Sequence, residues 1–469
     1  MNSSIQLQAT PSLSILSALA TQQMLYVLID AVPTLPSGSL PPVGLNLCLL
    51  LDRSGSMQGQ KIAHLREAVR ILLRSMSPGD IVSIVLFDDR VDTLLSPQAV
   101  GDPALLDALL PNIRERGGTA LAFGLRRALQ LVESGMAADR INRILLLTDG
   151  ETWGDEEECK QIAAACGARG IGIQAFGLGA EWKASLLDAV AQASGGQSDY
   201  LATPDALVTG FVKAVRALQV TWVRNATLTL RLPTGVRPRA AWRVVPQIKR
   251  LEPRFVTDRN VLTPLGEIQN AVGQSVLFEL MLEPRGVGAV RIAQAELEFD
   301  IPTRGILSEK IREDVIVTLQ EEGRPLPPLN PRVMNLAEKV NAFKLQTRAL
   351  DEAALGNRSG ATQQLRALAT QLLDLGAEDL ALTAAQQASA LEQNMALDEA
   401  AKKLLQYGTR NLGEEGEAIA PPTSQKPQSS TPAMTSSADT ASAVSLSRPA
   451  DISADREPAA PATHEEPQA

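Results

Sequence analysis

The sequence feature that most constrains the fold is an alternation of apolar runs with segments of helical spacing between Leu45 and Leu218. The first run, Leu45–Leu51, precedes a segment whose apolar residues recur every three or four positions, as on one face of a helix. Further apolar runs occur at Ile81–Phe87, Ile144–Thr148 and Ile171–Leu178. Apolar strands that alternate with amphipathic helices predict a doubly wound α/β domain, in which helices cover both faces of a mostly parallel sheet.

The sequence on either side of this region has a different apolar period. Between Trp222 and Gln320 apolar and polar residues alternate, which predicts a half-exposed antiparallel sheet. The first 42 residues contain two strand-like pieces, Ile5–Gln8 and Met24–Ala31, and are too short to form a domain. We expect these pieces to pair with the later strands. The α/β domain, residues 43–219, would then be inserted in a β-sandwich made from residues 1–42 and 220–325.

The C-terminal part of the chain has a third composition. Residues 332–413 are rich in Ala, Leu, Gln and Glu, and Leu365, Leu368 and Leu372 have helical spacing. Breaks at 357–360 and at Gly376 predict a small helical region of three or four helices. Residues 414–469 are rich in Pro, Ser and Thr and contain nine acidic and three basic residues. We expect this tail to be disordered, because it cannot bury enough apolar surface to offset the entropy of ordering it.

Charge and composition argue against several classes of protein. Most of the net charge of −9 lies in the tail, so we expect no basic face for binding nucleic acid. Two histidines are too few for a His-based zinc site or a Ser-His-Asp triad. No basic residue precedes Arg53, whereas a signal peptide begins with positive charge. No apolar run reaches the roughly 18 residues of a membrane span. We therefore expect a cytoplasmic protein without a membrane span.

Oxygen-bearing side chains follow the predicted strands at the points where the strands end. Asp52, Ser54 and Ser56 follow the first apolar run at alternate positions, and Asp149 follows the third run. Thr119 comes after two glycines, at the start of a segment with helical spacing. In open α/β sheets ligands bind beyond the carboxyl ends of the strands. Two carboxylates and three hydroxyls are therefore expected to converge from three loops.

The chemistry of this set favours one kind of metal ion. All the donors are hard oxygens, which suit Mg²⁺ or Mn²⁺ better than zinc, and Ca²⁺ would normally draw more carboxylates. If the two carboxylates act through waters, the direct ligands are neutral hydroxyls. The metal then stays electrophilic and is expected to accept a carboxylate from outside the protein.

The order and spacing of these five residues resemble the metal-ion-dependent adhesion site (MIDAS) of von Willebrand factor type A (VWA) domains. The resemblance covers roughly Leu45–Leu218. It implies that the hydroxyls of Ser54, Ser56 and Thr119 bind Mg²⁺ directly, and that Asp52 and Asp149 act mainly through waters. A Glu or Asp of a partner protein would complete the coordination. Many bacterial relatives have Asn after the Thr, where this chain has Ala120. That departure removes none of the five ligands.

The layout of the whole chain is also similar to bacterial VWA proteins akin to the calcium-activated chloride channel homologues. Without a membrane span, this resemblance does not imply a channel. It implies instead a non-enzymatic module that binds an acidic residue of a partner protein in bacterial signalling or complex assembly. An AAA-type ATPase or a kinase-linked component is the kind of partner that the family suggests.

The alternative function is a Mg²⁺-dependent hydrolase or phosphotransferase. The sequence contains no Gly-x-x-x-x-Gly-Lys-Ser/Thr loop to hold a phosphate. Ser54 also stands where haloacid-dehalogenase-type phosphatases have their second Asp, and no residue is placed as a general base. The sequence therefore favours a binding module over an enzyme.

Three further residues are candidates for contact with the partner. Arg53 lies inside the motif and is expected to point away from the metal, where a role in orienting an acidic partner is open. Asp88 and Asp89 follow the second apolar run, where they are expected to begin a solvated turn or, alternatively, to form the rim of the binding face. Glu151 follows the third run. It can belong to the rim or, with the acidic run that starts at Asp155, to a calcium-like second site, although Asp155 more simply caps a helix.

Overall fold

The computed structural model describes residues 4–34, 43–101, 103–137, 140–152, 154–219, 221–257, 259–269 and 272–413. These residues belong to one compact unit. The expectation for the tail, residues 414–469, lies outside the described residues. Within the described part, no helix is both long and apolar enough to cross a membrane.

The segment between residues 43 and 219 forms a doubly wound α/β domain, as its alternating pattern predicts. Its six strands lie in the order β6-β5-β4-β7-β8-β9, and every neighbouring pair is parallel except β5 with β6. The strands are β4 (Gly44–Asp52), β5 (Ile81–Phe87), β6 (Val91–Ala99), β7 (Arg140–Thr148), β8 (Gly172–Leu178) and β9 (Ser198–Leu201).

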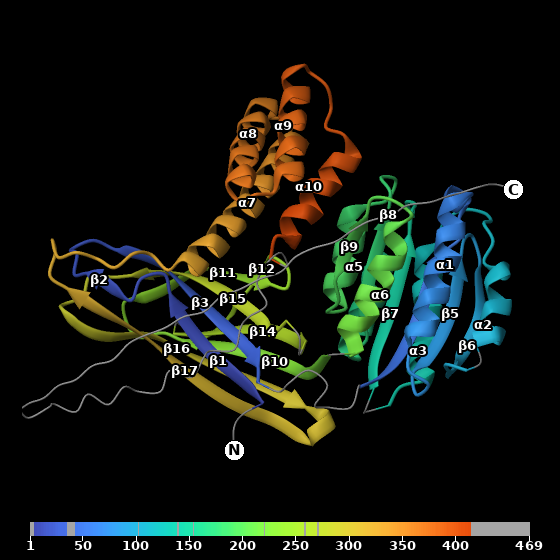
Figure 1. Cartoon of the computed structure of the whole chain (residues 1–469), viewed down its shortest axis with the longest axis horizontal. Coiled ribbons are helices and arrows are strands. Elements are labelled where there is room, and N and C mark those ends of the chain that lie inside the picture. The colour runs from blue at the N-terminus through green and yellow to red at the C-terminus, as the bar shows by residue number, and fades with distance from the viewer. Residues whose placement is uncertain are drawn as a thin grey trace, which may run out of the picture. The chain divides into compact units, whose positions relative to one another are not determined.

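Helices cover both faces of this sheet (Figure 1). Side chains from α1 and α6 join the apolar core on one face, and side chains from α3, α4 and α5 join the core on the other. The helical elements are α1 (Gln60–Ser75), α2 (Pro103–Leu109), α3 (Leu121–Ser134), α4 (Glu156–Ala168), α5 (Ala184–Ala193) and α6 (Ala206–Gln219), with short 3-10 turns at Gly55–Met57 and Leu110–Asn112. The central strands β4 and β7 are buried on both faces, which explains why they read as continuous apolar runs.

The sequence pattern missed strand β6, which pairs antiparallel with β5 at the edge of the sheet. Its residues are mostly half-buried or exposed, and it contains Pro97. Proline is tolerated on an edge strand because one side of the strand has no partner to hydrogen-bond. An exposed edge strand therefore lacks the apolar run by which the buried strands were found.

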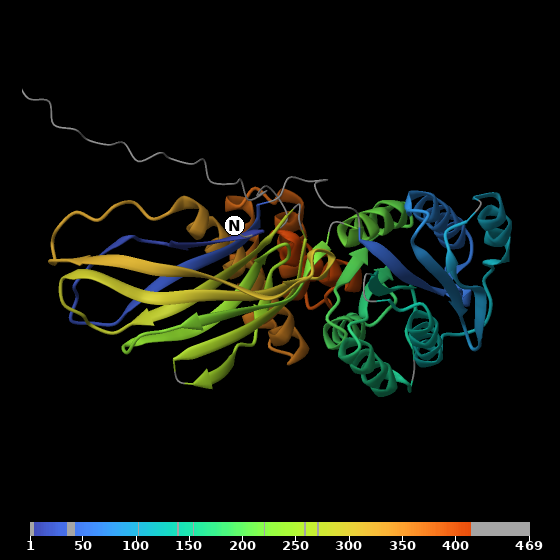
Figure 2. The ribbon, with the colours of Figure 1, turned by 90° about the horizontal axis from the view of Figure 1, so that it is seen from below.

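The remaining strands form two sheets packed around one apolar core, and the N-terminal strands are part of them. Strand β3 (Gln23–Pro33) lies between β1 (Ile5–Pro11) and β15 (Gln274–Leu282), antiparallel to both. Figure 2 shows these blue N-terminal strands beside green and yellow strands from the later part of the chain. The other strands are β2 (Ile15–Ser17), β10 (Thr221–Arg231), β11 (Val236–Val245), β12 (Lys249–Leu251), β13 (Arg254–Thr257), β14 (Asn260–Gln269), β16 (Gly288–Ile301) and β17 (Ile306–Gln320). The α/β domain is thus inserted in a β-sandwich, which confirms the expected fold class.

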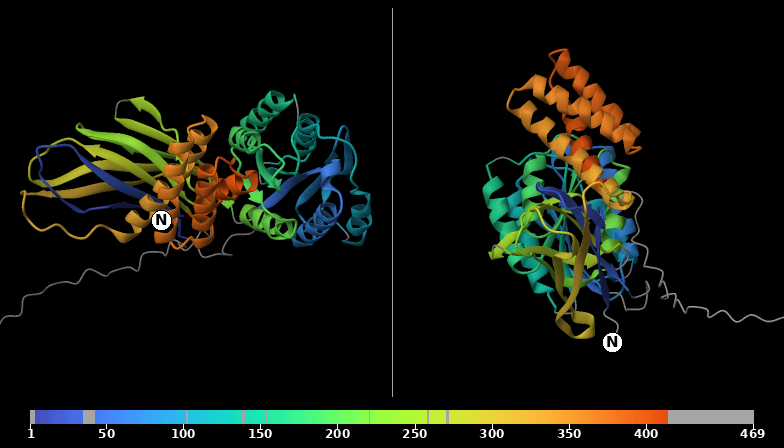
Figure 3. Two further views of the ribbon diagram at one scale, coloured as in Figure 1. Left: turned by 90° about the horizontal axis from the view of Figure 1, so that it is seen from above. Right: turned by 90° about the vertical axis from the view of Figure 1, so that its left-hand side faces the viewer.

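The C-terminal region consists of four helices in its described part, drawn in orange in Figure 3. They are α7 (Pro331–Ala354), α8 (Arg358–Asp374), α9 (Glu378–Glu392) and α10 (Glu399–Asn411). Asn357, which the sequence placed at a break, caps α8 by accepting a hydrogen bond from the Gly360 N–H at 3.1 Å. Side chains of α7 share an apolar core with Trp242 of β11 and Leu277 of β15. The helical region therefore packs on the sandwich.

Candidate metal site

The parallel pairing of β4 with β7 brings the two aspartates of the motif to the same edge of the sheet. Leu51 lies opposite Leu147, so Asp52 and the Thr148-Asp149 pair leave the sheet side by side. Thr119 precedes α3, and the backbone holds its loop against the first loop. The Gly55 N–H donates to Gly117 O at 3.0 Å, which is why residues so far apart in the sequence meet.

The three hydroxyls of the motif surround one small space. A Cβ built on Gly150 would lie 3.4 Å from Thr119 Oγ1, 3.5 Å from Ser56 Oγ and 3.8 Å from Ser54 Oγ. The oxygens of Ser54 and Thr119 are therefore separated by no more than the sum of 3.4 and 3.8 Å. Because position 150 is glycine, no side chain fills the space between these hydroxyls.

Asp149 is fully buried and joins this group through its carboxylate. The Ser56 hydroxyl donates to Asp149 Oδ1 at 2.7 Å and lies 3.0 Å from the Ser54 hydroxyl. The other oxygen, Oδ2, forms an ion pair with the ammonium of Lys61, in the first turn of α1. Sequence reasoning missed Lys61, although its position five residues after Ser56 puts it where α1 begins beside the motif.

Asp52 is fully buried, as Asp149 is. Its Oδ2 accepts a hydrogen bond from the Thr148 hydroxyl at 2.5 Å, and its Oδ1 accepts one from the Ser54 N–H at 2.8 Å. Burial raises the pKa of Asp52 to about 6, the charge of Asp149 adds to the rise, and the two hydrogen bonds limit it. A nearby cation would remove this penalty by stabilising the ionised carboxylate.

Two of the three candidate partner contacts, Arg53 and Asp88, are bound to each other. Arg53 is 6% exposed, and its Nε lies 2.5 Å from Asp88 Oδ2. Arg116 donates to the same carboxylate, and Asp92 also pairs with both arginines. Burial alone would raise the pKa of Asp88, but hydrogen bonds from Arg116, the Arg90 N–H and Arg53 lower it. The expectation of a solvated turn is thus wrong for Asp88, which is 1% exposed, whereas Asp89 is exposed.

The start of α3, directly after Thr119, is capped by residues from the loop after β7. The Ala122 N–H donates to Asp155 Oδ2 at 2.8 Å, and the Thr152 hydroxyl donates to Asp155 Oδ1. Asp155 does occupy the N-cap position of α4, but its carboxylate makes no capping bond to that helix. The sequence interpretation was therefore right about its position and wrong about the helix it caps. Its bonds link the Thr119 loop to the Asp149 loop.

Glu151 is half-buried, and its charge acts on Lys183 in the loop after β8 and on Lys403 of the helical region. The ammonium of Lys403 in α10 donates to the carbonyl oxygens of Ala180 and Trp182, at 2.5 and 2.6 Å. Burial lowers the pKa of Lys403, while the charges of nearby acids, Glu151 among them, act to raise it. Because this loop follows β8, it leaves the sheet at the same edge as the motif.

The residues present fit a small hard cation. The described residues contain no group of three or more His, Cys, Asp or Glu that could hold a metal. Three converging hydroxyls beside one carboxylate and a second, hydrogen-bonded one are instead the donor set that Mg²⁺ or Mn²⁺ accepts. The Lys61 ammonium already supplies positive charge to Asp149, so it would compete with such an ion.

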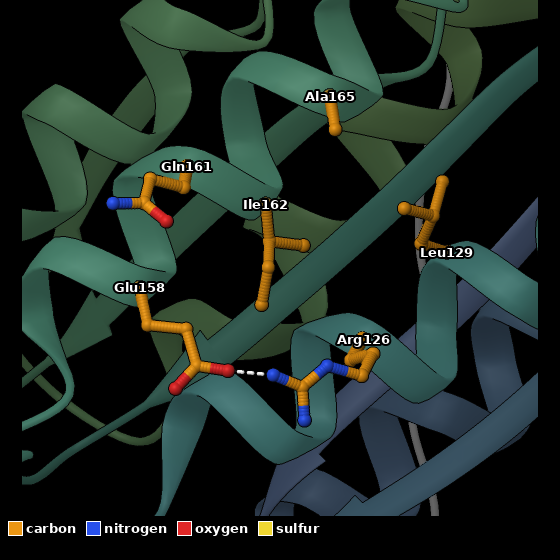
Figure 4. A pocket seen from close by; sticks show the side chains of 6 residues that line it. All are labelled: Arg126, Leu129, Glu158, Gln161, Ile162 and Ala165. Carbon is orange, nitrogen blue, oxygen red and sulfur yellow. Dashed lines mark ion pairs between the residues drawn. The ribbon is translucent and has the colours of Figure 1, made fainter.

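A separate surface groove lies between α3 and α4 and has a volume of about 550 Å³ (Figure 4). An ion pair between Arg126 and Glu158 crosses it, and Leu129 and Ile162 form its apolar wall. None of the predicted site residues lines this groove.

Comparisons with known proteins identify two domains in the chain. Residues 46–209 match the model of the von Willebrand factor type A domain, and the structure has the fold of that domain there, so the chain contains a VWA domain. This class is a family of protein-interaction modules. Residues 331–415 match the Sll0103-like, C-terminal alpha-helical domain.

The relatives include one that matches along most of the chain. The protein sll0103 of Synechocystis is 26% identical over 332 residues, which cover 69% of this chain and 78% of the relative. The inter-alpha-trypsin inhibitor heavy chain H3 of Rattus norvegicus is 34% identical over 135 residues, but these cover only 27% of this chain and 15% of that protein.

Two solved structures share the fold. The von Willebrand factor type A protein from Catenulispora acidiphila has a TM-score of 0.66 at 16% identity, and covers 87% of this chain and 97% of its own. The ArnB paralog VWA2 from Sulfolobus acidocaldarius has a TM-score of 0.51 at 14% identity, and covers 88% and 100%. At these identities the likeness concerns the fold alone.

Proposed function

We propose that this chain is a non-enzymatic protein-binding module whose metal site captures an acidic residue of a partner protein. Asp52, Ser54, Ser56, Thr119 and Asp149 would hold Mg²⁺ or Mn²⁺. The observation that carries the proposal is the convergence of three hydroxyls, from two separate loops, on one space beside the Asp149 carboxylate.

The role of each residue is the one that the resemblance to the VWA metal site implies. Ser54, Ser56 and Thr119 present neutral oxygens to the metal, and Asp52 and Asp149 act mainly through waters. Bound in this way, the metal supplies a Lewis acid that attracts a carboxylate. Arg53 and Asp88 would act on the partner indirectly, by fixing the Asp52 and Thr119 loops, and Glu151 would lie on the rim.

The finer parts of the proposal come from the sequence alone. The AAA-type ATPase or kinase-linked partner and the likeness to the chloride channel homologues rest on the family resemblance, and the cytoplasmic location stays an expectation. The alternative, a Mg²⁺-dependent hydrolase or phosphotransferase, gains no supporting observation from the described residues.

The test is a pull-down with the full chain immobilised, in Mg²⁺ and in chelator, combined with calorimetric titration of Mn²⁺. Thr119→Ala is expected to abolish both Mn²⁺ binding and partner capture. Thr203→Ala is the matched control, because Thr203 is exposed in the loop after β9. Unchanged Mn²⁺ affinity in Thr119→Ala would refute the metal site. Capture that persists in chelator would refute the role of the metal in binding the partner.

A further inference from the structure

A second group of charged residues lies where β11, β12 and α10 meet. Arg243 of β11 and Lys249 of β12 are directly opposite each other in an antiparallel pair. Like charges in this position repel and destabilise a sheet. The Ile248 N–H donates to the carbonyl oxygen of Arg410 at 2.8 Å, which brings the C-terminal end of α10, and a third cation, to the same place.

The carboxylate within reach of these cations is already bound. Asp188 of α5 pairs with Arg410, with N–O distances of 2.9 and 3.1 Å. It also accepts hydrogen bonds from Tyr407 and Gln406, at 3.0 Å each. Asp188 is therefore satisfied by α10 and leaves Arg243 and Lys249 without a counterion.

Neither Arg243 nor Lys249 forms an ion pair with a carboxylate in the part of the chain that the structure describes. Arg243 Nε donates to the carbonyl oxygen of Gln247 at 3.3 Å. Burial, reinforced by the charge of Arg410, lowers the pKa of Arg243 to about 10. Burial and the charges of Arg243 and Arg410 lower the pKa of Lys249 to about 8. Positive charge is thus in excess here.

Arg243 lines a cavity of about 520 Å³. The other charged residues of the wall balance one another: Arg143 pairs with Glu267, and the charge of Lys213 is matched in sum by that of Asp199. The wall therefore carries one excess positive charge, at Arg243, and Lys249 lies opposite Arg243 in the sheet.

We propose that this cavity binds an anionic group, a phosphate or a carboxylate, against Arg243 and beside Lys249. The group has two possible sources. One is a free small anion. The other is the chain itself, because Gly413 lines the cavity and the sequence continues with Glu414, Glu415 and Glu417.

This inference does not depend on the metal site. Arg143 and Gln174 line the cavity from the amino-terminal halves of β7 and β8, whereas the motif lies beyond the carboxyl ends of β4 and β7. Failure of one proposal therefore leaves the other intact.

The test is calorimetric titration of inorganic phosphate into the full chain, at constant ionic strength and in a buffer without other multivalent anions. Arg243→Gln is expected to weaken phosphate binding at least about tenfold, because it removes a charge-assisted hydrogen-bond donor. Arg250→Gln is the matched control. Arg250 is on the neighbouring strand β12 but is exposed, and its substitution is expected to change nothing. Lys249→Gln serves as a second variant if Arg243→Gln does not fold.

A third variant identifies the source of the anion. Glu414→Gln, Glu415→Gln and Glu417→Gln in one chain remove the adjacent carboxylates. If this chain binds phosphate at least several-fold more tightly than the wild type, and Arg243→Gln abolishes the gain, the tail is the natural occupant. If its affinity equals that of the wild type, the occupant is a free anion. Absence of phosphate binding in both chains, or equal binding in Arg243→Gln, would overturn the proposal.

Discussion

Two charged clusters of this molecule have imbalances of opposite sign. At the carboxyl edge of the VWA sheet, the charges of Asp52 and Asp149 act on each other, and one ammonium, that of Lys61, pairs with Asp149. Where β11, β12 and α10 meet, Arg243, Lys249 and Arg410 face one carboxylate, that of Asp188. The first cluster is short of positive charge and the second is short of negative charge. The comparison leads us to expect that a partly buried imbalance indicates the sign of the charge that binds there, whereas balanced networks such as Arg53-Asp88 hold loops in place.

The largest expected effect is on the first cluster. Asp149→Ala removes the carboxylate that holds the Ser56 hydroxyl and frees Lys61 to repel a cation. We expect the affinity for Mn²⁺ to fall by about 100-fold or more, measured by calorimetry. Glu157→Ala, an exposed acid on α4, is the control. A similar loss in both variants would mean that general charge, and not the site, attracts the metal.

For the second cluster we predict an effect on the stability of the fold. Asp188→Ala leaves the largely buried Arg410 without its partner, and we expect the free energy of unfolding to fall by about 2–3 kcal/mol in urea titrations. Glu392→Ala breaks the exposed pair with Arg366 and is expected to cost less than about 1 kcal/mol. Equal losses would show that the contact between α10 and α5 is no stronger than a surface pair.

Substitution of Lys61 makes the charge of the first cluster more negative, whereas Asp149→Ala makes it less negative. Lys61→Met removes the ammonium that competes for Asp149 Oδ2, so we expect Mn²⁺ to bind about tenfold more tightly. Lys160→Met, on the exposed face of α4, is expected to leave the affinity unchanged. Weaker binding in Lys61→Met would mean that the ammonium helps to hold Asp149 in place for the metal.

The smallest effect is the dependence on pH. The pKa of Asp52 is raised from 3.8 to about 6, so its proton must leave before a cation is stabilised. We expect Mn²⁺ affinity to be flat above pH 7 and about twofold lower at pH 6, and Asp52→Asn to abolish this dependence. In the metal-free protein, the raised pKa means that Asp52 contributes most to the stability of the fold below about pH 4. This contribution is lost as the pH rises through 6. A pH profile that Asp52→Asn leaves unchanged would assign the proton elsewhere.

The sequence predicted the first cluster because its residues follow strand ends. Parallel strands deliver their carboxyl ends to one edge, so Asp52 and Asp149 were placed together without knowledge of the contacts. Lys61 and the hydrogen bond from Thr148 were missed because a helix start and a strand terminus carry no special pattern. The sequence also did not show that Arg53 would pair with Asp88.

The second cluster left no signal in the sequence. Arg243, Lys249, Asp188 and Arg410 come from four elements, and Asp188 is separated from Arg410 by 222 positions. Which residues pair across two strands depends on the register of the strands. The alternating apolar pattern shows on which face of a strand each side chain lies, but it does not give the partner on the neighbouring strand. The apolar pattern did suffice to predict the inserted α/β domain. Alternating apolar and polar residues give way to continuous apolar runs at the point where the sandwich is interrupted.

The most direct test of the central claim is an anomalous difference map from a crystal of the full chain grown with Mn²⁺. We predict a single peak at the carboxyl edge of the sheet, in contact with the hydroxyl oxygens of Ser54, Ser56 and Thr119, with the Lys61 ammonium displaced from Asp149. An ion bound elsewhere, or saturating Mn²⁺ with no peak between those hydroxyls, would contradict it.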